Sequence, residues 1–99
     1  MILIYIENRE LLTKTITYIE NAGLSYTTDT NVEYEYLLIA ETSNKVIELI
    51  NEANKNNKKI IFNAYLEEKN IYKKTSKNYF NKLSNILNKC DKTIVSLPS

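Results

Sequence analysis

The sequence predicts a single α/β domain built on a parallel sheet, and two observations carry that prediction. Short aliphatic runs recur along the chain, at 2–6, 36–40, 60–65 and 93–97, and such runs suit strands that are buried on both faces. Stretches with helical spacing of apolar residues lie between most of these runs. With 99 residues the chain is long enough for one core, and we expect one domain, 1–99.

Helix signals follow the first and the third of the expected strands. Asn8 can cap a helix, and Gly23, the single glycine of the chain, stands where a helix commonly ends in a left-handed residue. Thr42 or Ser43 can cap a second helix. Apolar residues recur at helical spacing in both stretches: Leu12, Ile16 and Ile19 in the first, and Val46, Ile47, Ile50 and Ala53 in the second.

The longest helix is expected from Glu68 to Lys89, before the last strand. Residues 24–28 form a shorter and more polar run, as expected of an edge strand. The order of elements is therefore β-α-β-β-α-β-α-β, which predicts a three-layer, Rossmann-like domain with right-handed crossovers. Its five-stranded, mostly parallel sheet has the expected strand order 2-1-3-4-5. The connection at 29–35 contains no helix signal and is the unusual crossover of this topology.

The composition excludes several kinds of chemistry. The chain has no histidine and one cysteine, which excludes a histidine general base, a Cys-His pair, the usual zinc sites and an internal disulfide. Cys90 continues the apolar face of the third helix, and we expect a buried, inert thiol there. The net charge of +1 names no partner. We therefore expect no catalysis, no metal and no cofactor.

Candidate ligand-binding residues follow the strands, because doubly wound sheets bind ligands outside the carboxyl ends of their strands, near the switch point between the first and third strands. The loop after the first strand has no glycine, which argues against a phosphate-binding loop. Residues 41–43 follow the third strand, and the hydroxyls of Thr42 and Ser43 suit either a small anion or ordinary helix capping. Adjacent glutamates at 67 and 68 suit acid/base work or the dipole of a helix start. The candidates are Glu7, Asn8, Thr42, Ser43, Asn63, Tyr65, Glu67 and Glu68.

Lysines surround the expected third helix, with aromatic residues between them. That pattern suits anionic lipid headgroups or an acidic partner, and it also describes a solvated helix face whose aromatic residues pack on the sheet. No recognised nucleic-acid motif accompanies the charge, so specific nucleic-acid binding is not expected. These residues are Lys69, Lys73, Lys74, Lys77, Lys82 and Lys89.

Several segments together resemble a known family. In them the chain is similar to the N-terminal, acceptor-side domain of bacterial GT-B glycosyltransferases of family 4. The group is that of the low-GC Gram-positives and mollicutes, many of which glucosylate membrane diacylglycerol. The similarity is most specific at 63–68 and 91–98. The segments are Met1–Leu12, Asn21–Asp29, Glu35–Ile39, Lys59–Glu68 and Cys90–Pro98.

The chain departs from that family at positions that the activity uses. Residues 10–15 contain no glycine, and Asn63 and Tyr65 stand where the family often has histidines. The 99 residues contain no counterpart of the C-terminal domain that binds the nucleotide sugar in such enzymes, so we expect no donor site in them. The resemblance therefore implies a fold and an ancestry. It implies a noncatalytic, glycosyltransferase-like binding or interaction module, which acts as a scaffold, a regulator or a split subunit for a membrane-glycolipid glycosyltransferase.

Two alternatives stay open: a small-ligand sensor that uses the strand-end crevice, and an α/β protein like the EIIB subunits of sugar phosphotransferase systems. The second lacks the cysteine that its chemistry needs after the first strand, where residues 7–9 are Glu-Asn-Arg. In the main interpretation we expect a protein partner or self-association, with peripheral contact to an anionic membrane as a separate hypothesis. No apolar run is long enough to span a bilayer and no leader is visible, so we expect the cytoplasm or the inner membrane face.

Overall fold

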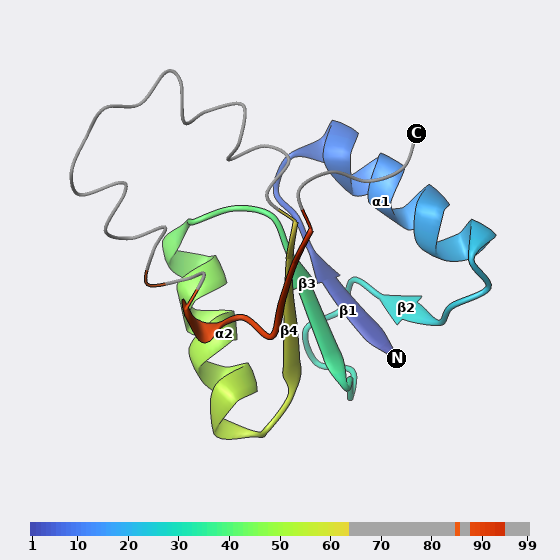
Figure 1. The fold of residues 1–99 in the computed structure, drawn as a ribbon. Helices are drawn as coiled ribbons and strands as arrows, with labels where there is room; N and C mark the ends of the chain where they lie inside the picture. The colour runs from blue at the N-terminus through green and yellow to red at the C-terminus, as the bar shows by residue number, and fades with distance from the viewer. Residues whose placement is uncertain (64–84, 86–87, 95–99) are drawn as a thin grey trace, which may run out of the picture.

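Four strands and two helices make up the first 63 residues of the computed structural model (Figure 1). In order they are β1 (Ile2–Tyr5), α1 (Arg9–Asn21), β2 (Tyr26–Thr27), β3 (Tyr36–Ile39), α2 (Asn44–Lys55) and β4 (Lys59–Asn63). A further strand, β5 (Lys92–Ile94), follows later in the chain. The structure describes residues 1–63, 85 and 88–94. The prediction of an α/β domain with a parallel sheet is confirmed.

All strand pairs in the described sheet are parallel. β1 lies between β2 and β3, and β4 lies beside β3, so the order β2-β1-β3-β4 agrees with the prediction. β5 pairs with the outer side of β4, from Ile61↔Lys92 to Asn63↔Ile94. The helix expected over residues 68–89 lies outside the described residues except near its end, where residues 88 and 89 are helical.

The crossover from β2 to β3 contains no helix, and the short length of β2 explains why none is needed. β2 pairs only with Ile2 and Leu3, at the amino end of β1. Because β3 also starts beside Ile2, the chain passes under the end of β1 and does not retrace the length of the sheet. A turn at Asp29 starts this path. Its side chain accepts a hydrogen bond from the Asn31 N–H at 2.9 Å, and its carbonyl accepts from the Val32 N–H at 3.2 Å.

One helix covers each face of the sheet, so the described residues form three layers (Figure 1). On one face, α2 packs Val46 and Ile50 against a cluster of sheet residues that includes Phe62. On the other face, α1 packs Leu11 and Ile19 against a cluster that includes Ile4. Burial of both sheet faces explains why the strands are continuous aliphatic runs rather than alternating ones.

Side-chain caps start both helices. The Asn8 Oδ1 atom accepts a hydrogen bond from the Leu11 N–H at 2.9 Å, which confirms Asn8 as the cap of α1. For α2 the cap is Ser43 rather than Thr42, because the Ser43 Oγ atom accepts from the Val46 N–H at 3.3 Å. Since Asn8 follows β1 and Ser43 follows β3, the two caps lie at the same edge of the sheet.

Both helices end in a Schellman motif, in which a left-handed residue lets the chain turn back on the last helical carbonyls. In α1 that residue is Gly23, at φ +73°, and the Leu24 N–H donates to the Ile19 carbonyl at 3.2 Å. This confirms the predicted end of the helix. In α2 the position is taken by Asn57, at φ +58°, and the next N–H donates to the Ala53 carbonyl at 2.8 Å.

The buried side of α1 differs from the predicted stripe. The residues that are fully buried are Leu11, Thr15 and Ile19, whereas Leu12 and Ile16 are only half-buried. The most buried face of α1 therefore includes a threonine, and a pattern of apolar residues alone does not predict that a threonine is buried. Thr15 is 0% exposed, and its hydroxyl has no hydrogen-bond partner in the described part of the chain.

Candidate functional site

The carboxyl ends of β1 and β3 meet at one edge of the sheet, and the Glu41 carboxylate joins the loops that follow them. Its Oε1 atom accepts a hydrogen bond from the Glu7 N–H at 2.9 Å, and its Oε2 atom accepts from the Asn8 N–H at 2.7 Å. This edge is the switch point of the sheet, where doubly wound domains bind their ligands. Here the N–H groups of two successive residues hold a carboxylate of the chain itself.

The local structure explains why these donors face Glu41. The chain bends at residues 7 and 8, Asn8 has extended dihedral angles of φ −72° and ψ 115°, and the helix starts at the next residue. The N–H groups of residues 7 and 8 therefore precede the helix and need partners from elsewhere. Glu41 supplies them from the loop of the adjacent strand, and charge-assisted hydrogen bonds of this kind are stronger than neutral ones.

A phenol and a second carboxylate lie at the same edge. The Tyr5 hydroxyl lies 3.5 Å from the Glu7 Oε2 atom, which is a long contact for a hydrogen bond. Burial raises the pKa of Tyr5, and the negative charges of Glu7 and Glu41 raise it further. The phenol is therefore protonated at neutral pH. The edge therefore carries two acidic side chains, Glu7 and Glu41.

Five of the eight predicted ligand-binding residues lie in the described part of the chain. The structure brings Glu7 and Asn8 together on the Glu41 carboxylate, and it uses Ser43 as a helix cap. Thr42, which precedes Ser43 in the chain, is half-buried. Asn63 is fully buried at the carboxyl end of β4. Tyr65, Glu67 and Glu68 lie outside the described residues.

Most of the predicted lysine surface also lies outside the described residues. Lys89 is described and exposed, and its ammonium group donates to the Asn51 Oδ1 atom at 3.2 Å. Because Asn51 belongs to α2, the Lys89 side chain contacts that helix. The remaining lysines of the surface are Lys69, Lys73, Lys74, Lys77 and Lys82.

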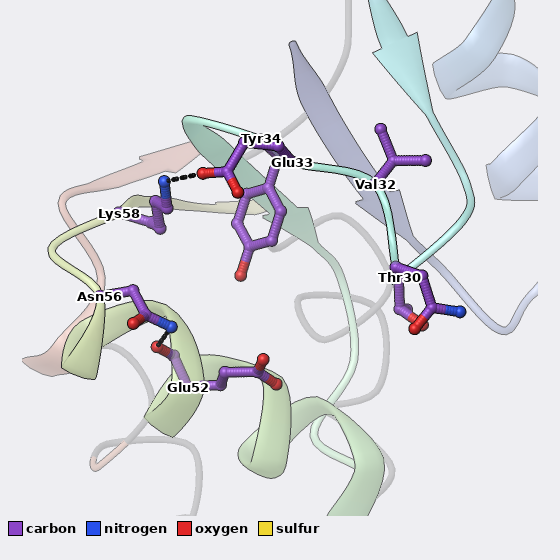
Figure 2. A pocket seen from close by; sticks show the side chains of 8 residues that line it. Thr30, Val32, Glu33, Tyr34, Glu52, Asn56 and Lys58 are labelled. Carbon is purple, nitrogen blue, oxygen red and sulfur yellow. Dashed lines mark hydrogen bonds and ion pairs between the residues drawn. The ribbon is translucent and has the colours of Figure 1, made fainter.

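A hollow of about 480 Å³ lies at the opposite edge of the sheet, before the amino ends of β3 and β4 (Figure 2). The connection between β2 and β3 forms one wall, and the last turn of α2 forms the other. Hydrogen bonds within each wall fix its backbone, at the Asp29 turn and at the Schellman motif of α2. The lining residues are Thr30, Asn31, Val32, Glu33, Tyr34, Glu52, Asn56 and Lys58.

The charged groups that line the hollow do not balance one another. The Lys58 ammonium lies 2.7 Å from the Glu33 Oε1 atom and 5.8 Å from the centre of the Tyr34 ring (Figure 2). Glu52 takes part in no ion pair among the described residues. Burial of Tyr34 raises the pKa of its hydroxyl, and the charge of Glu52 adds to that effect. The hollow therefore carries one carboxylate more than it has ammonium groups.

Comparisons with known protein families, with curated proteins and with solved structures found no match to this chain.

Cys90 is half-buried rather than fully buried, and it packs against the core cluster on the α2 side of the sheet. Burial raises the pKa of its thiol to about 11, and the charge of Asp91 acts in the same direction. A thiol with this pKa is protonated at neutral pH, as expected of an unreactive cysteine.

The described residues contain no group of three or more Cys, Asp and Glu side chains that could hold a metal ion. No helix within the described residues has the length and apolar character needed to cross a bilayer.

Sequence reasoning named residues 41–43 only as neighbours of the switch point and gave Glu41 no role. One signal was present: the backbone N–H groups of the loop after β1 need acceptors, and Glu41 is the first acidic residue after the adjacent strand. The hollow had no comparable signal, because its two walls come from separate segments of the chain.

Proposed function

We propose that this chain is a noncatalytic binding or interaction module. One observation carries the proposal: the Glu41 carboxylate holds the N–H groups of Glu7 and Asn8 at the switch point. These are the donors that a doubly wound enzyme would offer to a ligand. An incoming phosphate would find them in use and would also meet the negative charge of Glu41.

The resemblance to the acceptor-side domain of GT-B glycosyltransferases supports this proposal, because it implies a shared fold and ancestry without the residues that the activity uses. We propose the complete order β-α-β-β-α-β-α-β for the chain, with a third helix between β4 and β5 and the strand order 2-1-3-4-5. The module serves as a scaffold, a regulator or a split subunit for a membrane-glycolipid glycosyltransferase, through a protein partner or by self-association. The lysines of residues 69–89 face the acidic partner or an anionic membrane.

The absence of catalysis is tested with purified protein and UDP-glucose, with diacylglycerol as acceptor. We expect no turnover. Turnover that is lost in a Glu67→Gln/Glu68→Gln variant would overturn the proposal. The membrane contact is tested separately by flotation with vesicles of phosphatidylserine and phosphatidylcholine. Binding should weaken as the salt concentration rises, because the Debye length shortens, and no flotation at low salt would contradict the membrane contact.

The partner is tested by light scattering of the purified chain alone and with a candidate donor-domain subunit. A stoichiometric complex with that subunit, or a defined homo-oligomer, supports an interaction module. A monomer that forms no complex with the glycosyltransferases of its own host contradicts that role.

The hollow beside α2 favours one second candidate function, a sensor of small organic cations. Its walls are fixed by hydrogen bonds, and Glu52 gives it an unbalanced negative charge beside the Tyr34 hydroxyl. A volume of about 480 Å³ lies in the range of small-ligand sites. An ammonium group of the ligand would pair with Glu52, and its remaining polar groups would meet Asn56 and Thr30.

This sensor is tested by thermal unfolding with 1,4-diaminobutane and with the neutral butane-1,4-diol. The diamine should raise the melting temperature and the diol should not, because only a ligand of the folded state stabilises it. Glu52→Gln should remove the effect. Glu48→Gln, which changes an exposed glutamate one turn earlier in α2, should keep it. An equal response of all three proteins would reject the hollow as a cation site.

A further inference from the structure

We propose that the N–H groups of Glu7 and Asn8 form a carboxylate-binding site that the chain fills with its own Glu41, and that a carboxylate from another molecule binds there when Glu41 is withdrawn. In this inference Glu41 is an autoinhibitory side chain. The inference deepens the proposed function and rests on it, since it supplies the binding that a noncatalytic module needs.

The donor geometry fits a carboxylate. The two N–H groups belong to successive residues, and each donates to a different oxygen of one carboxylate, at 2.9 Å and 2.7 Å. Two successive backbone N–H groups that donate to one anion can form an anion-binding site, as these two do for the Glu41 carboxylate. Because both oxygens are engaged, the fit is to a planar, bidentate anion.

The proposed site uses N–H groups that precede the helical residues of α1, and two N–H groups of the first turn of α1 have Asn8 as their acceptor. The Leu11 N–H donates to the Asn8 side chain, and the Leu12 N–H donates to the Asn8 carbonyl, each at 2.9 Å. The donors of the proposed site lie before the first helical residue. The carboxylate is also an observed occupant, so the chemistry of the ligand is read from what the site already holds.

The occupant is tethered on a short segment that can be perturbed without dismantling the core. Glu41 is half-buried, and it lies between the buried end of β3 and the Ser43 cap of α2. A tethered group has a high effective concentration at its site, so free carboxylates do not displace Glu41 from the intact protein. A partner that moves the start of α2 would withdraw Glu41 and expose the two N–H groups.

The experiment replaces Glu41 and restores the carboxylate from solution. Wild-type protein, Glu41→Ala and the matched control Glu48→Ala are unfolded thermally in sodium acetate, inorganic phosphate or sodium chloride at equal ionic strength and pH. Acetate should stabilise Glu41→Ala beyond chloride, with saturation. At ten times the Kd the ratio of folded to unfolded protein should rise about elevenfold. Wild type and Glu48→Ala should respond to acetate as they do to chloride.

The outcomes separate the ligand classes. Stabilisation of Glu41→Ala by acetate but not by phosphate assigns the site to carboxylates, and stabilisation by phosphate alone overturns that assignment. If Glu41→Ala is unfolded in chloride, recovery of folded protein in acetate is the same test. The absence of any acetate-specific effect on Glu41→Ala overturns the inference. That failure leaves the proposed noncatalytic function standing, because UDP-glucose turnover by the wild type tests the function independently.

Discussion

The Glu41 carboxylate accepts a hydrogen bond from the Asn8 N–H at 2.7 Å, although the two residues lie 33 positions apart in the chain. They follow adjacent parallel strands that pair through Tyr5↔Ile39. Asn8 also caps α1, while Glu41 precedes the cap of α2 by two residues. The Glu41 carboxylate therefore links the start of α1 to the start of α2. It also occupies the backbone N–H groups of Glu7 and Asn8 at the carboxyl ends of β1 and β3.

This contact predicts a measurable loss of stability in Glu41→Ala. Removal of a carboxylate that accepts two backbone hydrogen bonds should lower the free energy of unfolding by about 2 kcal/mol. Urea unfolding measures the change. The matched variant Glu48→Ala removes a glutamate whose ion pair with Lys45 is 4.0 Å long and exposed, so it should change the free energy by less than about 0.5 kcal/mol. Equal effects of the two variants would contradict the structural role of Glu41.

The buried hydroxyl of Thr15 predicts a stabilising substitution. Thr15→Val keeps the branched shape of the side chain and removes a hydroxyl that has no partner among the described residues. The free energy of unfolding should rise by about 1 kcal/mol, because an unsatisfied buried polar group is costly. Thr17→Val is the control, since the exposed Thr17 hydroxyl donates to the Thr13 carbonyl at 2.9 Å and should give no gain. Destabilisation by Thr15→Val would show that the hydroxyl is satisfied.

The two Schellman motifs predict different effects when their left-handed residues are replaced. Gly23→Ala should lower the free energy of unfolding by about 1 kcal/mol through backbone strain alone. An added Cβ would meet no atom within 4 Å there. Asn57→Gly places the most permissive residue at φ +58° and should be neutral or slightly stabilising. Urea unfolding of both variants checks the pair, and a neutral Gly23→Ala would contradict the left-handed assignment at that position.

The thiol of Cys90 predicts a pH dependence of both reactivity and stability. Since burial raises its pKa from 9.0 to about 11, the folded state favours the protonated thiol. This stabilising contribution is complete below pH 9 and is lost as the pH rises from 9 to 11. At pH 8 the thiolate fraction should be roughly a hundredfold lower than for an ordinary cysteine.

Alkylation of Cys90 with iodoacetamide measures this reactivity in the folded protein and in urea. The folded protein should react much more slowly at pH 8, and the difference should narrow as the pH approaches 11. Equal alkylation rates in the folded protein and in urea at pH 8 would show that the thiol is not buried and that its pKa is not raised.

Features set by local sequence were predictable. The strands follow from aliphatic runs, and the ends of α1 follow from Asn8 and Gly23, because caps and left-handed residues act within a few positions. The polar run at 54–59 indicated where α2 ends, but Asn57 was not identified as its left-handed residue, since an asparagine indicates such a residue less clearly than a glycine does. The buried line of α1 was missed because Thr15 is polar by composition and buried by position.

Features set by strand order were not predictable from local patterns. The contact of Glu41 with Asn8 exists only because β1 and β3 are neighbours in a fixed register. The hollow exists only because the short β2 lets the next segment pass close to the last turn of α2. In both cases the participating residues are separated in the sequence by other elements, and only the assembled sheet brings them together.

The most direct test of a closed switch point follows the amide signals of Glu7 and Asn8 by NMR while UDP-glucose is added to the wild-type protein. Because Glu41 holds both N–H groups, neither signal should move beyond what sodium chloride produces at equal ionic strength. A saturable shift of both signals in the wild type would mean that the edge is open to a ligand, and it would contradict the account.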